Sequence, residues 1–218
     1  MKNLKSILLL VVTFLLLVIP SNSYSQIQKG TYSIGGNIFA NYQSSNQSGI
    51  TFLSYNLSIN PNIGYFISDK TMVGIGTGFT FSNFDQESSN YKSTNSTYTY
   101  SLNLFYRKYW FEQQNKVGFF MQTSISPGIR HSNLQTNNNT SDPNSVVNGV
   151  LADDFVGTIS INPGIVYLIN PHLSVETTYG NLIYTLTAGM PHMPSHSVNL
   201  SFNISTFNIG FRYYFGRK

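Results

Sequence analysis

The chain has 218 residues, of which 9% are charged and 15% are aromatic, and its formal net charge is +4. Charged residues make up about 25% of an ordinary soluble domain, so this composition is low in charge for a soluble globular fold. The chain has no cysteine, which excludes disulfides, thiolate metal sites and a lipid anchor on cysteine. Lys and Arg cluster only at Gly216-Arg217-Lys218, so the sequence has no basic patch for nucleic acid.

Residues 1–25 have the pattern of a secretory signal peptide. Lys2 and Lys5 give a positive start, and an almost purely apolar run follows from Ile7 to Ile19. We predict that this segment is cleaved and that a single mature domain covers 26–218. A retained helical anchor is the alternative, although the run is short for a membrane-spanning helix.

A period of two runs through the stretch from Leu53 to Ile67. Its odd positions carry apolar residues, Tyr or Pro, whereas its even positions are small or polar except for Phe66. Such alternation predicts a β-strand with one apolar and one polar face. Ordinary strands have about five or six residues, whereas a strand that crosses a bilayer has about 9–11 and shows this pattern. The length and the alternation together therefore favour a membrane-spanning strand.

The rest of the domain alternates in the same way and divides into eight predicted strands. They cover residues 31–42, 53–67, 71–84, 97–111, 117–130, 154–169 and 173–184, with a last strand that ends at residue 215. We predict an all-β fold, an eight-stranded antiparallel up-and-down transmembrane β-barrel, or meander. The barrel must be closed because every backbone polar group in hydrocarbon needs a partner.

Short and long connections alternate along the chain. The short ones are 68–70, 112–116 and 170–172, and the longer ones, rich in Asn, Ser and Thr, are 43–52, 85–96, 131–153 and 186–197. Outer-membrane barrels have short periplasmic turns and longer extracellular loops. We therefore expect both termini to be periplasmic and the four polar loops to be extracellular.

The final strand, from Phe207 to Phe215, alternates and ends on an aromatic residue. With the signal peptide, the alternating strands and the alternating connections, it resembles the small OmpA/OmpX-type barrel proteins of Gram-negative outer membranes. The resemblance implies a place in the cell outer membrane among its lipids, and it implies that Phe215 is an assembly signal for the barrel assembly machinery. It does not identify an extracellular ligand or an activity, because such barrels include adhesins, pores, enzymes and structural proteins.

Charged residues at inward positions are the best candidates for a designed site. Arg107, Glu176 and Arg212 lie near the periplasmic ends of three predicted strands. A buried charge in a narrow barrel must be paired, so we predict that Glu176 lies between the two arginines and plugs the lumen. Three separately solvated charges are the alternative. Arg130 and Asp154 are a second possible lumen pair, nearer the extracellular side.

Catalytic and metal-binding constellations are missing from the sequence. His131 and Ser132 faintly resemble the His and Ser of outer-membrane lipid A deacylases, but neighbours in a strand point to opposite faces. His192 and His196 have the spacing of ligands on one helix turn, but Pro191 and Pro194 argue against a helix. We predict no catalytic residue, no cofactor and no metal site.

The leading functional hypothesis is a non-enzymatic outer-membrane barrel with a structural or surface-interaction role and a largely side-chain-filled lumen. A small pore for ions or small solutes is the alternative, because Gly74, Gly76 and Gly78 face inward on one strand. A lipid-modifying enzyme that uses His131 or His192 is a third hypothesis.

Two features of the predicted strands are irregular. Pro61, Pro127 and Pro163 lie within strands although proline donates no hydrogen bond, so each is expected to mark a bulge or local distortion. The apolar residues near the end also change from even to odd positions, which predicts a bulge or strand entry near Ser205 and Thr206.

Overall fold

The computed structural model describes residues 27–88, 91–111, 116–138, 146–189, 192–201 and 208–216. The predicted signal peptide and the predicted bulge near Ser205 and Thr206 lie outside these residues, so both stay predictions. Within the described ranges, no helix is long and apolar enough to cross a membrane.

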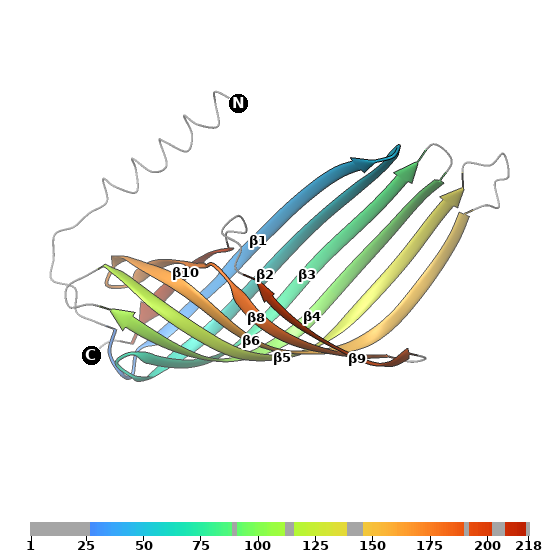
Figure 1. Cartoon of the computed structure of the whole chain (residues 1–218). Helices are drawn as coiled ribbons and strands as arrows, with labels where there is room; N and C mark the ends of the chain where they lie inside the picture. The colour runs from blue at the N-terminus through green and yellow to red at the C-terminus, as the bar shows by residue number, and fades with distance from the viewer. Residues whose placement is uncertain are drawn as a thin grey trace, which may run out of the picture.

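Ten strands form one antiparallel sheet (Figure 1). They are β1 (Tyr32–Gln47), β2 (Ile50–Ser68), β3 (Thr71–Ser88), β4 (Tyr91–Phe111), β5 (Val117–Asn138), β6 (Val146–Asn170), β7 (Leu173–Thr178), β8 (Asn181–Gly189), β9 (His192–Ser201) and β10 (Asn208–Phe215). The all-β antiparallel fold predicted from the alternation is confirmed.

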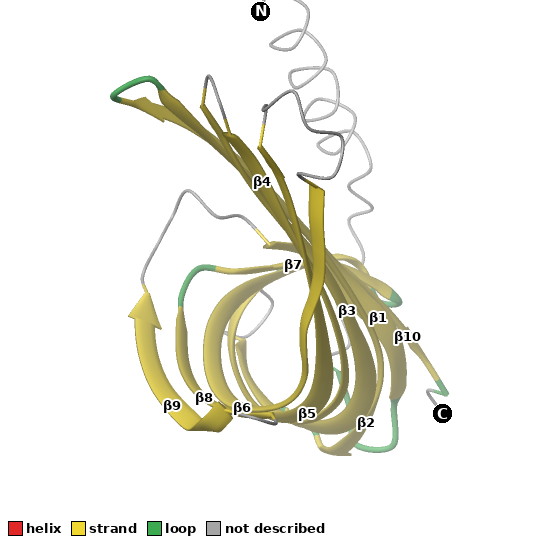
Figure 2. Cartoon of the chain, turned by 90° about the vertical axis from the view of Figure 1, so that its right-hand side faces the viewer, coloured by secondary structure: helices red, strands yellow, loops and turns green. Residues whose placement is uncertain are grey.

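Strand pairing closes this sheet into a ring, which Figure 2 shows end-on. β1 to β6 pair in chain order, β6 pairs with β7, β7 pairs with β10, and β10 returns to β1. Eight strands therefore surround the lumen at the end near the chain termini. Outward positions of these strands carry exposed apolar residues, such as Ile63 at 53% and Ile125 at 54%, which is the pattern of a lipid-facing surface.

The seventh predicted strand is not continuous, contrary to the sequence expectation. β6 pairs Gly164 with Thr178 of β7 but Ile161 with Leu182 of β8, so three steps along β6 match four steps along the partner. The extra residue is a bulge, which moves the inward face from even positions in β7 to odd positions in β8. The last predicted strand is likewise divided, into β9 and β10.

Each strand proline lies where a ladder is interrupted. The β2–β3 ladder lacks its pair at Pro61, the β4–β5 ladder lacks its pair at Pro127, and Pro163 pairs with neither β7 nor β8. There, the Tyr179 N–H donates to the Pro163 carbonyl at 3.3 Å. In an antiparallel ladder the N–H and C=O of a residue face the same neighbour, so each proline lacks a donor on the side of the interruption. The expected bulge is found beside Pro163, whereas the register is unchanged across Pro61 and Pro127 and only the ladder is interrupted there.

The predicted loop bounds were wrong, because strands extend into those segments. β1 and β2 are joined by a tight turn at Ser48 and Gly49, which have φ of 52° and 80°. The β3–β4 ladder continues to the pair Ser88–Tyr91, and β6 already begins at Val146. Asn disfavours strands by propensity whereas Thr favours them, and pairing with neighbouring strands overrides the preference of Asn. Figure 2 shows part of the sheet extending beyond the ring.

Inward glycines in the ring make room for bulky side chains on neighbouring strands. A Cβ at Gly74 would overlap the Phe105 ring, and one at Gly164 would overlap the Phe120 ring. Side chains of neighbouring strands thus fill the space that the glycines leave, and the interior at this level is packed rather than open.

We expect Gly74→Val to destabilise the barrel, because the new side chain would displace Phe105 and press on the Ile63 carbonyl. Overpacking of this kind costs about 1–3 kcal/mol, which should lower the midpoint of unfolding in denaturant. Gly157→Val is the matched control, because a Cβ there meets only the Phe155 ring at 3.5 Å and beyond. Equal midpoints for the two variants would show that Gly74 is not a packing position.

Candidate functional site

Arg107, Glu176 and Arg212 meet at one level of the lumen. Arg107 Nη1 lies 2.5 Å from Glu176 Oε2, and Arg212 Nε lies 3.1 Å from Glu176 Oε1. The side chains of Arg107 and Glu176 are 7% exposed and that of Arg212 is 1% exposed. The three residues come from β4, β7 and β10. Arg212 and Glu176 lie on the neighbouring strands β10 and β7, whereas the ion pair between Arg107 and Glu176 crosses the lumen from β4 to β7.

Polar neighbours satisfy the remaining donors of the arginines. Arg107 donates through Nε and Nη2 to Gln122 Oε1, at 2.9 and 2.6 Å, and through Nη1 to the Tyr109 hydroxyl at 3.1 Å. Arg212 donates through Nη1 to Ser33 Oγ at 3.1 Å. Buried charges are tolerated only when paired and hydrogen-bonded, and this cluster meets that condition from five strands.

Two tyrosine hydroxyls complete the shell around the carboxylate. Tyr109 donates to Glu176 Oε1 at 3.3 Å and Tyr214 does so at 3.5 Å. Each tyrosine lies two residues beyond an arginine on the same strand, and residues two apart share one face of a strand. The strand period therefore places an arginine and a tyrosine together on both sides of Glu176.

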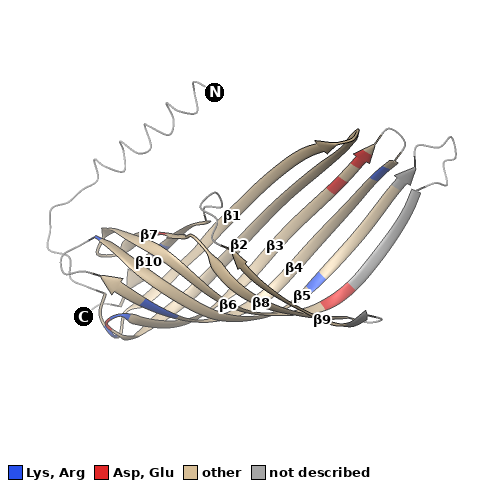
Figure 3. Ribbon diagram, in the orientation of Figure 1, with Lys and Arg blue, Asp and Glu red and all other residues tan. Residues whose placement is uncertain are grey.

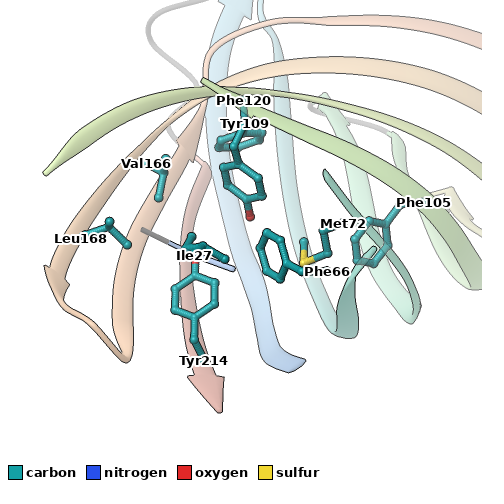
Figure 4. Packing of buried hydrophobic residues seen from close by; sticks show 9 residues of the cluster. All are labelled: Ile27, Phe66, Met72, Phe105, Tyr109, Phe120, Val166, Leu168 and Tyr214. Carbon is teal, nitrogen blue, oxygen red and sulfur yellow. The ribbon is translucent and has the colours of Figure 1, made fainter. Parts of the chain in front are cut away.

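A layer of buried apolar side chains lies at the end of the barrel where Tyr32 and Phe215 are paired (Figure 4). The Phe66 ring stacks on Tyr109 with centroids 5.7 Å apart and lies 6.1 Å from Tyr214. The Arg107 guanidinium lies over the Phe120 ring, 4.2 Å from its centroid. Such a contact adds to the stabilisation of a desolvated cation. The charge cluster and these rings together form a plug of two kinds of contact.

A polar cavity of about 390 Å³ lies on the other side of the charge cluster. Its walls carry mainly Asn, Ser and Thr from inward positions, and Arg107, Glu176 and Arg212 are among its lining residues. The side-chain oxygens of Asn62, Asn103 and Asn208 have no hydrogen-bond partner among the described residues. The cavity thus offers hydrogen-bond acceptors above a floor that carries two positive charges and one negative charge.

Arg130 and Asp154 are directly opposite each other on β5 and β6, but the described contacts include no ion pair between them. At this level the described contact is between His131 Nδ1 and Asp153, on the other face of the same two strands. The second lumen pair of Arg130 and Asp154 therefore stays a prediction.

The remaining candidate residues have structural neighbours. Ser132 lies on the face opposite His131 and shares a hydrogen bond with Thr97 at 3.2 Å. His196 Nδ1 lies 2.7 Å from the Tyr184 hydroxyl, and the side chain of His192 lies outside the described residues. Phe215 ends β10 and stacks on Tyr32 at 5.8 Å between centroids; its role as an assembly signal stays a prediction.

Sequence reasoning missed several members of the cluster. Gln122, Ser33 and Tyr214 contact the charges, but nothing in their residue types marks them as partners. The available signal was position, because all three are inward residues at the level that the arginines occupy. Finding them required the register between strands, which the sequence pattern did not supply.

A closed antiparallel ring with an apolar outer face and a plugged polar lumen defines the class of integral β-barrel membrane proteins. Residues 11–215 match the family described as outer membrane protein beta-barrel domain. The chain belongs to this family, which confirms the resemblance to small outer-membrane barrels and implies location in the outer membrane.

Solved structures of outer-membrane barrels are similar to this chain. Neisserial surface protein A has 14% identity and a TM-score of 0.40, with 86% of this chain and 98% of that chain covered. OprG from Pseudomonas aeruginosa has 12% identity and a TM-score of 0.38, with 87% and 98% covered. The N-terminal β-barrel domain of Pseudomonas aeruginosa OprF has 13% identity and a TM-score of 0.31, with 86% and 99% covered. No curated protein matches the chain.

We expect Glu176→Ala to lower the unfolding midpoint strongly, because it leaves Arg107 and Arg212 facing each other in a buried space. Breaking a buried ion pair from one side costs about 3–5 kcal/mol. The double variant Glu176→Ala with Arg107→Ala should recover part of the loss, because residues of one network are not additive.

Glu87→Ala is the matched control for this prediction. Glu87 pairs with Lys92 at 3.6 Å, but both side chains are more than half exposed. Loss of such a surface pair costs about 0–1 kcal/mol. If Glu176→Ala were as mild as Glu87→Ala, or if the double variant were additive, the charges in the lumen would not form a network.

Proposed function

We propose that this protein is a non-enzymatic outer-membrane barrel with a closed lumen and a structural or surface-interaction role. The observation that supports it is the plug, in which the Arg107, Glu176 and Arg212 cluster lies against an apolar layer across the ring. In this proposal the outer-membrane lipids surround the barrel and the barrel assembly machinery inserts it.

The surface role is supported by the strand ends that continue beyond the ring. β5 and β6 stay paired up to Asn137 and Val146, whereas β8 leaves β6 at the pair Phe155–Ala188. Charged residues gather toward the ends of the strands (Figure 3). We infer that this polar extension faces the cell exterior, with both termini in the periplasm, because long connections of such barrels are extracellular.

A small pore is the second candidate, and the polar cavity of about 390 Å³ is the observation that favours it. The inward glycines that suggested a pore give it less support, because Phe105 fills the space beside Gly74. A pore would therefore require the charge cluster to open.

Single-channel recording separates the two candidates. We expect the purified and refolded protein to insert into planar bilayers without a steady conductance, because the plug spans the lumen. Insertion is checked separately by the change in gel migration between unheated and boiled samples. A steady open conductance of the folded protein would contradict the closed-lumen proposal and support the pore.

Labelling of intact cells tests the proposed orientation. The chain has no cysteine, so single variants Gln47→Cys and Lys70→Cys each carry one reactive thiol at an exposed position. We expect a membrane-impermeant maleimide to label Gln47→Cys on whole cells and Lys70→Cys only after the outer membrane is permeabilised. The reverse pattern would invert the topology.

A further inference from the structure

The outer surface of the barrel carries a groove that the lumen does not explain. Its volume is about 740 Å³, and residues of β2, β3, β4, β5 and β6 line it, most of them at outward positions. One wall is a row of large apolar side chains that are directly paired from strand to strand, namely Ile59, Phe79, Tyr100, Ile129 and Phe155.

The floor of the groove is the next outward row, two residues along each strand. It consists of Pro61, Thr77, Leu102 and Pro127, so three of its four members are short or flat, and the same row continues on β6 at Gly157, beyond the lining of the groove. The row after that is large again, with Ile63, Ile75, Leu104, Ile125 and Ile159. This row of mostly short side chains, the low row, lies between two rows of large side chains, the high rows. It therefore forms a channel that runs across the strands, in the hydrogen-bonding direction of the sheet.

The strand prolines account for much of this low row. Pro61 and Pro127 are the outward residues at the gaps in the β2–β3 and β4–β5 ladders. Their rings are short and rigid, and neither can be replaced there without restoring a donor. Four spacings of about 4.8 Å between five strands make the groove about 19 Å long.

The groove runs obliquely across the apolar belt, and its end on β6 lies near polar residues. Immediately beyond the high row of Ile129 and Phe155 lie His131 and Asp153, whose exposed side chains are in hydrogen-bond contact. Beyond Ile59 and Phe79 the next row is still apolar, with Leu57 and Phe81. The β6 end therefore lies near the membrane surface, and the β2 end lies deeper in the hydrocarbon.

We propose that the groove binds one acyl chain of a lipid in the leaflet at the barrel end opposite the termini. In the proposed orientation this is the outer leaflet. Only the choice of leaflet depends on that orientation. The chain enters beside His131 and Asp153, where its headgroup stays in the polar region, and runs along the floor toward Pro61. A hydrocarbon chain in contact with both walls gains dispersion contacts that it lacks on a convex surface.

The apolar lining and the place in the lipid-facing belt favour hydrocarbon as the occupant. Tyr100 and Ile129 on the wall are 58% and 61% exposed, so the wall stands open to whatever surrounds the barrel. Since the family places the barrel in the outer membrane, acyl chains are the molecules that meet this surface.

Quenching of a single tryptophan by brominated lipid tests the proposal. The only tryptophan, Trp110, is replaced by Phe, and Tyr100→Trp then places the probe on the groove wall. The control is Ile38→Trp in the same background, because Ile38 extends the same row onto β1 beyond the groove lining and is 60% exposed. Both are refolded into phosphatidylcholine vesicles with increasing fractions of dibrominated phosphatidylcholine.

We expect the groove tryptophan to be quenched more strongly than the control at each fraction of brominated lipid, because a chain held in the groove stays in contact with the probe. Thr77→Phe, which fills the floor, should return the groove probe to the control curve, whereas Ile75→Phe on the neighbouring high row should not. Folding of every variant is checked by gel migration before and after boiling.

Identical curves for the two probes, or a curve that Thr77→Phe leaves unchanged, would overturn the proposal. Protection of the groove probe from brominated lipid, together with a dimer in cross-linking, would also overturn it and assign the groove to a second copy of the chain. The measurement does not depend on the lumen, so it stands apart from the conductance test of the closed barrel.

Discussion

Backbone hydrogen bonding in hydrocarbon is the constraint on which the rest of this structure depends. A lipid bilayer offers no partner for an N–H or C=O group, so a sheet that crosses it has to close on itself. Here closure runs through β10, which pairs with both β1 and β7. A ring of eight strands leaves an interior that side chains fill, and this narrow interior determines what the inward residues can be.

The buried charges are a consequence of that narrow interior. Each of Arg107 and Arg212 would be costly alone in a poorly solvated lumen, and each is held by Glu176 between them. The ion pair between Arg107 and Glu176 crosses the lumen, so it also fixes β4 relative to the distant strand β7, whereas the pair between Arg212 and Glu176 joins the neighbouring strands β10 and β7. The hydroxyls of Tyr109 and Tyr214 add hydrogen bonds to the carboxylate and rings to the apolar layer, so polar and apolar packing are joined in the same side chains.

The strand prolines affect both the hydrogen bonding within the barrel wall and the shape of its outer surface. Each one interrupts a ladder on one side, yet the ring stays closed because the other side of the strand remains paired, as at Pro61 with Gly36 and Pro127 with Gly157. On the outer surface the same residues lower one row of the apolar belt. Each interruption affects a single strand, but Pro61 and Pro127 lie in the same row across five strands and together help to form the groove.

The sequence by itself determined the class of fold, the strand type and the two faces, because a period of two in residue type is a local property. It also identified Arg107, Glu176 and Arg212 as inward charges, and polarity requires such charges to be paired. Only the tertiary structure decided that Gln122 and Ser33 complete the cluster, that His131 is in contact with Asp153, and that strands run on through segments of loop-like composition. These outcomes depend on register and on neighbouring strands, and a one-residue change of register or one bulge reverses the faces without changing the local pattern.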